Sequence, residues 1–292
     1  MYHAGYFFLV FIFALTACSE SPPSEGKKVL VCGDNYVFIV DLESSTPDSP
    51  AVIWEWNAHE AMDLPESMRK RNFNSMDDCK MYDNGTKMMV SSSSGAVALI
   101  EVETKKVLFY AEVPNAHSVE MLPGNRLAAA ASTHARGNKL MVFDVETSDL
   151  IFEDSLYSGH GVVWDAQRKG LYALGYDVLR FYTDGSDGQL ILEKEWKIPG
   201  QSGHDLTMTP DGNHLLMTEH TGAWIFDIQE EAFGKIDDFP DAENIKSIVL
   251  HPDGQYVYTV PEESWWTYHV SFFNPQMKLA FPDVKVYKAR WF

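Results

Sequence analysis

Ser202-Gly-His-Asp-Leu-Thr-Met-Thr-Pro-Asp-Gly212 is the stretch of sequence that decides the fold, because its pattern returns along the chain. Within it, residues 205–209 alternate apolar and polar side chains, and the Pro-Asp-Gly turn separates them from a second strand-like run at 214–218. Two more runs follow at 223–228 and 233–239. Short runs separated by turn residues predict β-strands. Four consecutive strands make one unit of the size of a propeller blade.

This unit repeats with a period in the low forties. His117, His160 and His204 occupy the same place in successive units, 43 and 44 residues apart. A second marker, the end of the third strand, returns six times along the chain: at 40–43, 100–104, 143–147, 181–185, 226–229 and 272–275. Four-stranded repeats of this length are typical of β-propellers. The sequence therefore predicts an all-β fold, a six-bladed β-propeller of four-stranded antiparallel blades.

The two ends of the chain predict how the ring closes. The first strand-like segment, Lys28-Val-Leu-Val-Cys32, corresponds to the second strand of a blade. The last segment, 284–291, resembles a first strand such as 245–250. We therefore expect the C-terminal strand to complete the N-terminal blade, which leaves no open sheet edge in the ring. Residues 28–292 then form a single propeller domain.

An apolar segment precedes the propeller. Residues 7–16 have the length of a signal peptide and are too few for a permanent membrane span. They end in Leu15-Thr-Ala-Cys18, which resembles a bacterial lipobox, although the basic residue that usually comes first is missing. The resemblance implies a signal peptide at 1–17, lipidation of Cys18 and a flexible tether at 18–27. We expect this lipid anchor to be the only membrane contact, at the outer membrane, with the propeller periplasmic or surface-exposed.

Cysteine usage and charge limit the function classes. Cys32 and Cys79 remain once Cys18 is lipidated, and two thiols in an exported protein could pair. Both fall within predicted strands, where a free cysteine packs as a small apolar residue, and we favour free thiols. The chain carries 42 acidic and 23 basic residues, a net charge of −19. Such a balance argues against nucleic-acid binding. We expect a monomer.

One blade junction is longer than the repeat. Asp41 and Glu101 are 60 residues apart, and the surplus lies in residues 57–74. Insertions of this length in a compact fold are commonly functional. The segment is either a lid over a binding site or a helix on the surface, and the sequence does not distinguish between the two.

Alignment of the blades on their first turns brings polar residues to one equivalent position. Blade one is expected to contribute a residue near Lys285. In the other five blades, the position six residues before the turn holds Asp77, His117, His160, His204 and Lys246. First strands line the channel of a propeller, so these side chains should converge. Three neutral imidazoles and the Asp77 carboxylate suit a divalent transition metal (Mn, Zn, Fe or Ni). The alternative is that each histidine bonds only its neighbouring blade.

Loops between second and third strands open on the same face and supply further candidates. We interpret three residues as candidate catalytic bases: His134, His220 and Lys246. The candidate substrate-binding residues are Arg136, Tyr176, Glu219, Trp265 and Trp266. Tryptophan can stack on a sugar ring, and a basic side chain can hold a carboxylate. Each of them could instead be a polar loop tip or ordinary aromatic packing.

Several motifs together resemble an uncharacterised family of bacterial β-propeller lipoproteins: the lipobox, Trp54-Glu-Trp56, Asn115–Glu120, Gly159–Asp165, Gly203–Asp205 and Glu262–Trp266. The resemblance covers nearly the whole mature chain and implies no activity. The axial histidines also resemble, distantly, those of oligogalacturonate lyases, which implies a metal and elimination across a uronic acid. Regucalcin and gluconolactonase propellers hold their metal with acidic and amide residues. The histidine ring departs from that pattern, which weighs against lactonase chemistry.

The sequence thus predicts a cell-envelope lipoprotein whose axial pocket binds a metal and a carbohydrate or other small acidic ligand. The enzymatic hypothesis is a metal-dependent lyase on uronate-containing sugars, in which His220 or Lys246 removes the proton next to the carboxylate. The alternative is a non-enzymatic glycan- or protein-binding propeller of a nutrient-capture system. That alternative needs neither a metal nor a base.

Overall fold

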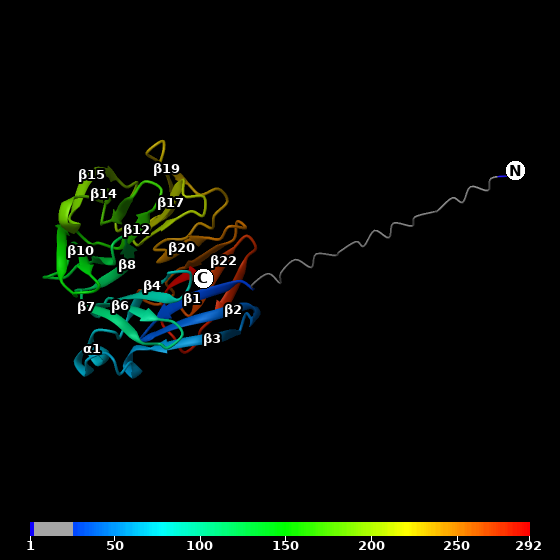
Figure 1. Ribbon diagram of the computed structural model, residues 1–292, viewed down its shortest axis with the longest axis horizontal. Helices are drawn as coiled ribbons and strands as arrows, with labels where there is room; N and C mark the ends of the chain where they lie inside the picture. Colours follow the sequence, from blue (N-terminus) through cyan, green and yellow to red (C-terminus); the bar gives the residue numbers. More distant parts are fainter. Residues whose placement is uncertain (3–25) are drawn as a thin grey trace.

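Six four-stranded sheets surround a common axis in the computed structural model, which describes residues 1–2 and 26–292 (Figure 1). Neighbouring strands within a sheet run antiparallel, as in the pairing of β1 with β2. The prediction of a six-bladed β-propeller is confirmed. The predicted lipidation site Cys18, with most of the signal peptide and tether, lies outside the described residues.

The blades are numbered here along the chain, and their strands run from the axis outward. Blade 1 consists of β24 (Val286–Trp291), β1 (Lys28–Gly33), β2 (Tyr36–Thr46) and β3 (Ser49–Asn57). Blade 2 consists of β4 (Met76–Tyr82), β5 (Lys87–Ser92), β6 (Ala96–Glu101) and β7 (Val107–Glu112). Blade 3 consists of β8 (Ala116–Leu122), β9 (Arg126–Ala131), β10 (Lys139–Asp144) and β11 (Leu150–Ser155). Blade 4 consists of β12 (Gly161–Asp165), β13 (Gly170–Leu174), β14 (Val178–Asp184) and β15 (Leu190–Lys197). Blade 5 consists of β16 (Asp205–Met208), β17 (His214–Glu219), β18 (Gly222–Asp227) and β19 (Ala232–Lys235). Blade 6 consists of β20 (Ser247–Leu250), β21 (Tyr256–Thr259), β22 (His269–Phe273) and β23 (Met277–Ala280).

Helical segments are few and short within residues 26–292. They are 3₁₀ turns at Ala58–Glu60 and Ser186–Gly188 and the helix α1 (Glu66–Arg71). Among the described residues, no helix combines the length and apolar character that crossing a bilayer requires.

Blade 5 shows how closely the pattern predicts the strands. Its first three strands lie within two residues of the predicted runs. The fourth was expected to extend to residue 239 but ends at Lys235. Soon after that point the chain turns through Asp238, whose φ of 54° is incompatible with an extended strand.

The ring closes through the C-terminal strand, as the ends of the chain predict. β24 is the innermost strand of blade 1 and pairs antiparallel with β1, so that Val29 lies opposite Trp291 and Val31 opposite Ala289. Ala289 packs in the apolar layer between blades 6 and 1. Lys288 and Arg290 alternate with it and belong to the channel side of the strand.

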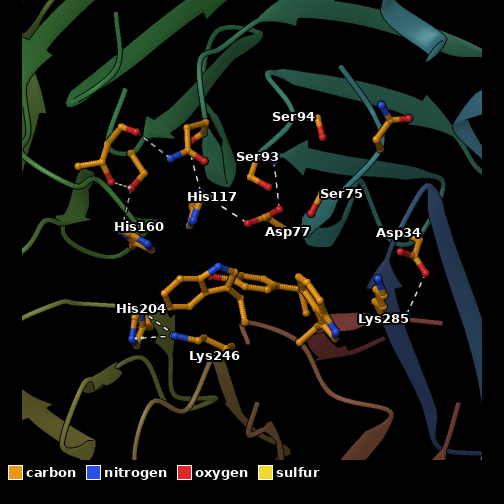
Figure 2. Close-up of a pocket in the computed structure, with 17 residues that line it drawn as sticks. Asp34, Ser75, Asp77, Ser93, Ser94, His117, His160, His204, Lys246 and Lys285 are labelled. Carbon is orange, nitrogen blue, oxygen red and sulfur yellow. Dashed lines mark hydrogen bonds and ion pairs between the residues drawn. The ribbon is translucent and has the colours of Figure 1, made fainter. Parts of the chain in front are cut away.

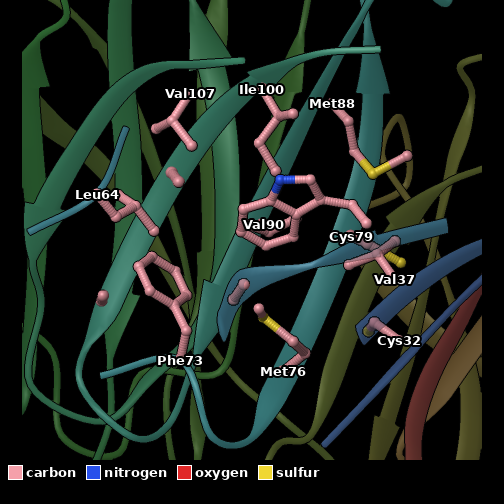
Figure 3. Close-up of a cluster of buried hydrophobic side chains, with 14 of the residues drawn as sticks. Cys32, Val37, Leu64, Phe73, Met76, Cys79, Met88, Val90, Ile100 and Val107 are labelled. Atoms are coloured by element: carbon pink, nitrogen blue, oxygen red, sulfur yellow. The ribbon is translucent and has the colours of Figure 1, made fainter. Parts of the chain in front are cut away.

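Apolar layers between neighbouring blades form the core. One of them joins blades 1 and 2 and contains Cys32, Cys79 and Phe73 (Figure 3). Full burial of a large apolar side chain stabilises the fold by roughly 1.5–3 kcal/mol. Both cysteines are free buried thiols, as we favoured from the sequence. Burial and a hydrogen bond with Cys32 raise the pKa of Cys79 well above 9.0.

The insertion at 57–74 packs on this same layer. Leu64, Met68 and Phe73 are buried in it, and the ring of Phe73 meets Trp56 edge-on at 6.2 Å. The helix α1 lies at the outer edge of the ring (Figure 1). Of the two alternatives, a lid or a surface helix, the segment is therefore the surface helix. Its last residue, Asn74, lines a pocket at the channel.

Candidate functional site

Six side chains, one from each blade, form a ring at one end of the central channel. The members of this axial ring are Asp77, His117, His160, His204, Lys246 and Tyr287. They line a single pocket of about 630 Å³, and Asp77, His117, His160, His204 and Lys246 are labelled around this space in Figure 2. Blade 1 contributes Tyr287, two residues beyond the expected position, although Lys285 also lines the pocket.

Local irregularities in the inner strands place these residues. In blades 1 to 3 the ring residue is the extra residue of a β-bulge, since the strand pairing skips Tyr287, Asp77 and His117. In blades 4 to 6 it stands directly before the strand, and its backbone N–H bonds the second strand, as His204 does with Thr218 at 2.8 Å. A bulge re-aims a side chain that regular alternation would direct into the sheet.

The three histidines are neutral. Burial, followed by the charge of Lys288, lowers the pKa of His117 to about 3. Burial and the charge of Lys246 lower the pKa of His204 to about 2, and the pKa of His160 is also well below its usual value, first because of burial. Nδ1 of His117 and of His160 donates to the carbonyls of Asn115 (3.2 Å) and Ser158 (2.8 Å). Their Nε2 atoms therefore carry the lone pair and can accept a proton or a hydrogen bond.

Lys246 is the cation of the ring, and among the described residues no carboxylate forms an ion pair with it. The residue is 2% exposed, and its Nζ donates to Nε2 of His204 at 2.9 Å. Within the described part of the chain, no carboxylate oxygen lies within 4.0 Å of this ammonium. Burial and the charge of Lys288 lower the pKa of Lys246 to about 8, against the opposing effect of the Asp77 carboxylate elsewhere in the pocket. A buried cation without a counter-ion is unfavourable unless a ligand supplies one.

Asp77 is a second group that titrates near neutrality. Its Oδ1 accepts from the backbone N–H of Ser93 at 3.0 Å, and its Oδ2 lies 3.5 Å from Nδ1 of His117. Burial raises the pKa of Asp77 to about 7, against the opposing effect of the Ser93 hydrogen bond and of Lys288. The pocket thus holds one carboxyl and one amine, Asp77 and Lys246, that change charge within a narrow range of pH.

A buried ion network closes the channel beneath the ring. Arg290 donates to both carboxylate oxygens of Asp205 at 2.6 Å and to Asp78 at 3.0 Å. Lys288 donates to Asp205 at 3.0 Å and to the backbone carbonyl of His117 at 3.1 Å. Although burial alone would raise the pKa of Asp205, Arg290 and Lys288 hold it well below its usual range. The network ties β24 to the inner strands of three other blades and supports the histidines from below.

Hydroxyl, amide and aromatic groups complete the pocket wall. Trp265 and Trp266, predicted as substrate-binding residues, do line it. Their loop is fixed by Glu262, which accepts from Thr267 Oγ1 at 2.7 Å and from the backbone N–H of Tyr268 at 2.9 Å. The lining residues that the sequence analysis did not single out are Asp34, Asn74, Ser75, Ser93, Ser94, Asn115, Ser132, Thr133 and Tyr287.

Five candidate residues lie outside this pocket: His134, Arg136, Tyr176, Glu219 and His220. His134 and Arg136 bond each other in an exposed turn, with the Arg136 N–H donating to Nδ1 at 3.0 Å. The exposed His220 contacts the Asn244 amide oxygen at 2.8 Å. Glu219 is buried and accepts from Trp224 Nε1 at 2.8 Å. The ring of Tyr176 is tilted against that of Tyr157, with the ring centroids 5.3 Å apart. Their predicted roles remain predictions, without support from their positions.

The four predicted metal ligands do not converge on one point in this arrangement. Among the described residues, no group of three or more His, Cys, Asp or Glu side chains is placed to hold an ion. The Lys246 ammonium contacts the Nε2 lone pair of His204. Asp77 lies beside Nδ1 of His117, on the other edge of the imidazole from Nε2. The predicted metal therefore needs a rearrangement of at least two of these side chains.

The fold and this site define a six-bladed β-propeller with a polar axial pocket. Residues 37–292 match a family of unknown function, DUF6528, and the chain belongs to this family. No protein with a curated description matches the sequence. The resemblance to an uncharacterised propeller family is confirmed to that extent, while the lipoprotein and lyase resemblances stay predictions.

Solved structures bear on the fold alone. A chain of the "Crystal Structure of Mitotic Checkpoint Complex" is similar over 90% of this chain and 72% of its own length, with a TM-score of 0.57 and 14% identity. In all, 1542 chains of solved structures match. A fold that is shared so widely does not indicate a function, which must be argued from the pocket.

Proposed function

We propose that this protein binds an acidic carbohydrate in its axial pocket. The observation that carries the proposal is Lys246, a buried ammonium without a carboxylate partner, in contrast to Lys288, whose ammonium pairs with Asp205 at 3.0 Å. A ligand carboxylate that approaches Lys246 forms a charge-assisted hydrogen bond and removes the cost of the unpaired charge.

Carbohydrate is favoured over other anions by the rest of the wall. Trp265 is 63% exposed at the pocket, so its indole face is available for stacking on a sugar ring. The neutral Nε2 atoms of His117 and His160 can accept hydrogen bonds from sugar hydroxyls, and the serine and asparagine side chains can donate. The volume of about 630 Å³ lies within the range of small-ligand pockets.

Titration calorimetry with uronic acids and the corresponding neutral sugars tests this proposal. We expect the uronates to bind more tightly than the neutral sugars, and Lys246→Met to weaken uronate binding by about tenfold or more. Lys278→Met is the matched control, because Lys278 is exposed on β23 and far from the axis in the blade. Equal affinities for neutral and acidic sugars, or full uronate affinity in Lys246→Met, would contradict the proposal.

A second candidate function is β-elimination across the bound uronic acid. The observation in its favour is that Asp77 and Lys246 titrate near pH 7 and pH 8 in one pocket. Groups tuned to opposite roles near neutrality are typical of acid–base catalysis. Lys246 would bind the carboxylate, and Asp77 would take the proton from the adjacent carbon. The electrons of that C–H bond would form a carbon–carbon double bond as the C–O bond on the next carbon breaks, and the departing oxygen would take up the proton from Asp77 and leave with its sugar. His220, our earlier candidate base, lies outside the pocket.

Ultraviolet absorbance of the unsaturated product distinguishes catalysis from binding. We expect product from oligouronates if the elimination occurs, and its loss in Asp77→Asn with uronate binding retained. Uronate affinity without any product supports the alternative, a non-enzymatic binding protein of a nutrient-capture system.

The metal-dependent form of the reaction stays a proposal of its own. His117 and His160 would offer Nε2 to a divalent transition metal, whose charge would neutralise the substrate carboxylate. Elemental analysis of protein purified without chelators decides between the two forms. One equivalent of metal, lost in His117→Ala/His160→Ala, would support the metal; sub-stoichiometric metal is expected if Lys246 is the group that binds the anion.

A further inference from the structure

We infer that the axial pocket contains a second anion subsite, so that the ligand is a carbohydrate with two acidic groups, an oligouronate of at least two units. The inference rests on the proposed function, since it assigns the first acidic group to Lys246. It extends that function by fixing the minimum length and charge of the ligand.

Lys285 is the cation of the second subsite. It lines the same pocket, and its side chain is exposed. Its Nζ lies 4.5 Å from the centre of the Trp266 ring. In the described part of the chain, no carboxylate comes within ion-pair distance of this ammonium. The nearby Asp34 binds the backbone of this residue and not its ammonium, since its Oδ2 accepts from the backbone N–H of Lys285 at 2.9 Å.

Trp266 fixes where this ammonium stands. The indole is partly buried and lines the pocket, and the Lys285 ammonium lies over its ring. Such a cation–π contact positions the lysine but supplies no counter-charge, so the ammonium can still pair with a ligand carboxylate. The indole nitrogen itself is buried beside the Tyr268 side chain and does not face the ligand.

The two subsites are built in the same way. Lys246 lies 5.6 Å from the centre of the Trp265 ring, and Lys285 lies 4.5 Å from that of Trp266. Figure 2 shows Lys246 beside His204 and Lys285 near Asp34, toward different ends of the pocket. Two lysine–tryptophan pairs from adjacent tryptophans match a ligand that repeats the same unit: a sugar ring for each indole and a carboxylate for each ammonium.

Calorimetric titration of mono- and diuronates into wild type, Lys246→Met, Lys285→Met and the Lys278→Met control tests the inference. The probes are the monomers and dimers of galacturonate, glucuronate and guluronate. In the best-binding series, we expect the dimer to bind about tenfold or more tightly than the monomer. Lys285→Met should abolish that gain and leave monomer affinity unchanged, whereas Lys246→Met should weaken both. Thermal unfolding of each variant checks that it folds.

The outcomes separate this inference from the function on which it rests. If the monomer binds through Lys246 but the dimer gains nothing, or Lys285→Met leaves the gain intact, the second subsite is wrong and the binding function stands. If neither monomer nor dimer binds in any series, both proposals are wrong. Equal weakening of monomer and dimer by Lys285→Met would assign both lysines to one acidic group and would also overturn the second subsite.

Discussion

Two buried lysines in this protein stand in opposite environments. Lys288 sits in an ion network in which every charge is paired, while among the described residues the hydrogen-bond partner of the Lys246 ammonium is a neutral imidazole. Pairing of a buried charge compensates for its loss of hydration, so an unpaired one is retained at a cost to stability. That cost is easiest to understand if Lys246 serves a ligand.

The two environments predict opposite effects of mutation on stability. Arg290→Met leaves Asp78 and Asp205 without their main partner, and we expect the free energy of unfolding to fall by about 3–5 kcal/mol. Lys246→Met removes an unpaired buried charge, and we expect stability to stay equal or rise by about 1 kcal/mol. Chemical denaturation measures both. A large loss of stability in Lys246→Met would mean that this lysine has a structural role.

The same residues predict how ligand affinity depends on pH. Asp77 gains negative charge above about pH 7, and Lys246 loses positive charge above about pH 8. Both changes weaken the binding of an anion, so uronate affinity should be highest below pH 7 and fall in two steps as the pH rises. Asp77→Asn should remove the lower step and keep the upper one. An affinity independent of pH across this range would contradict the assignment.

The free energy of unfolding of the ligand-free protein should depend on pH, because the pKa of Asp77 is raised and that of Lys246 is lowered on folding. The raised pKa of Asp77 means that the folded state binds more protons than the unfolded state between about pH 4 and pH 7, so its contribution falls as the pH rises there. The lowered pKa of Lys246 means that the unfolded state binds more protons between about pH 8 and pH 10, so its contribution rises there.

At the scale of elements, the inner strands explain what the sequence predicts about the site and what it does not. Counting from the first turn locates Asp77, His117, His160, His204 and Lys246, because each blade keeps the same distance between turn and channel. The count misses Tyr287, since β24 has no following turn to count from and contains a bulge. Contacts between blades, such as that of Arg290 with Asp205, form only when the ring closes, so they cannot be predicted from one strand. In the sequence, the sign of this network is the alternation of Lys288 and Arg290 with apolar residues.

The burial of two cysteines where β1 packs against β4 predicts how their thiols react. Cys32 and Cys79 are both fully buried and free, so neither should react with a thiol reagent in the native Cys18→Ser protein. Both should react once the protein is unfolded in denaturant without a reductant. If no thiol reacts after unfolding, the two cysteines are paired instead.

At the scale of the whole molecule, the period of the sequence predicts the fold almost completely. Six copies of the third-strand ending predict the number of blades. The first segment of the propeller matches a second strand, which predicts that the C-terminal strand closes the ring. The chemistry of the site is harder to predict from the sequence, because the convergence of side chains at the axis does not determine which of their atoms face each other. The contact of Lys246 with the His204 lone pair makes the ring a candidate anion site as well, and the predicted metal stays a proposal.

The lipid anchor belongs to the whole molecule and is tested on the full-length chain expressed in a bacterium. If the Leu15-Thr-Ala-Cys18 motif is processed as a lipobox, wild-type protein should partition into the detergent phase. Cys18→Ser should move the protein to the aqueous phase. Wild-type protein in the aqueous phase would contradict the anchor and leave the propeller site unaffected.

A crystal structure of the protein with a bound diuronate tests the central claim most directly. We predict one carboxylate within hydrogen-bond distance of Lys246 Nζ, a sugar ring against Trp265, and the second carboxylate at Lys285. A diuronate bound away from the axial ring, or one whose carboxylates both point to solvent while Lys246 stays without an anion, would contradict the claim that this pocket is built for an acidic carbohydrate.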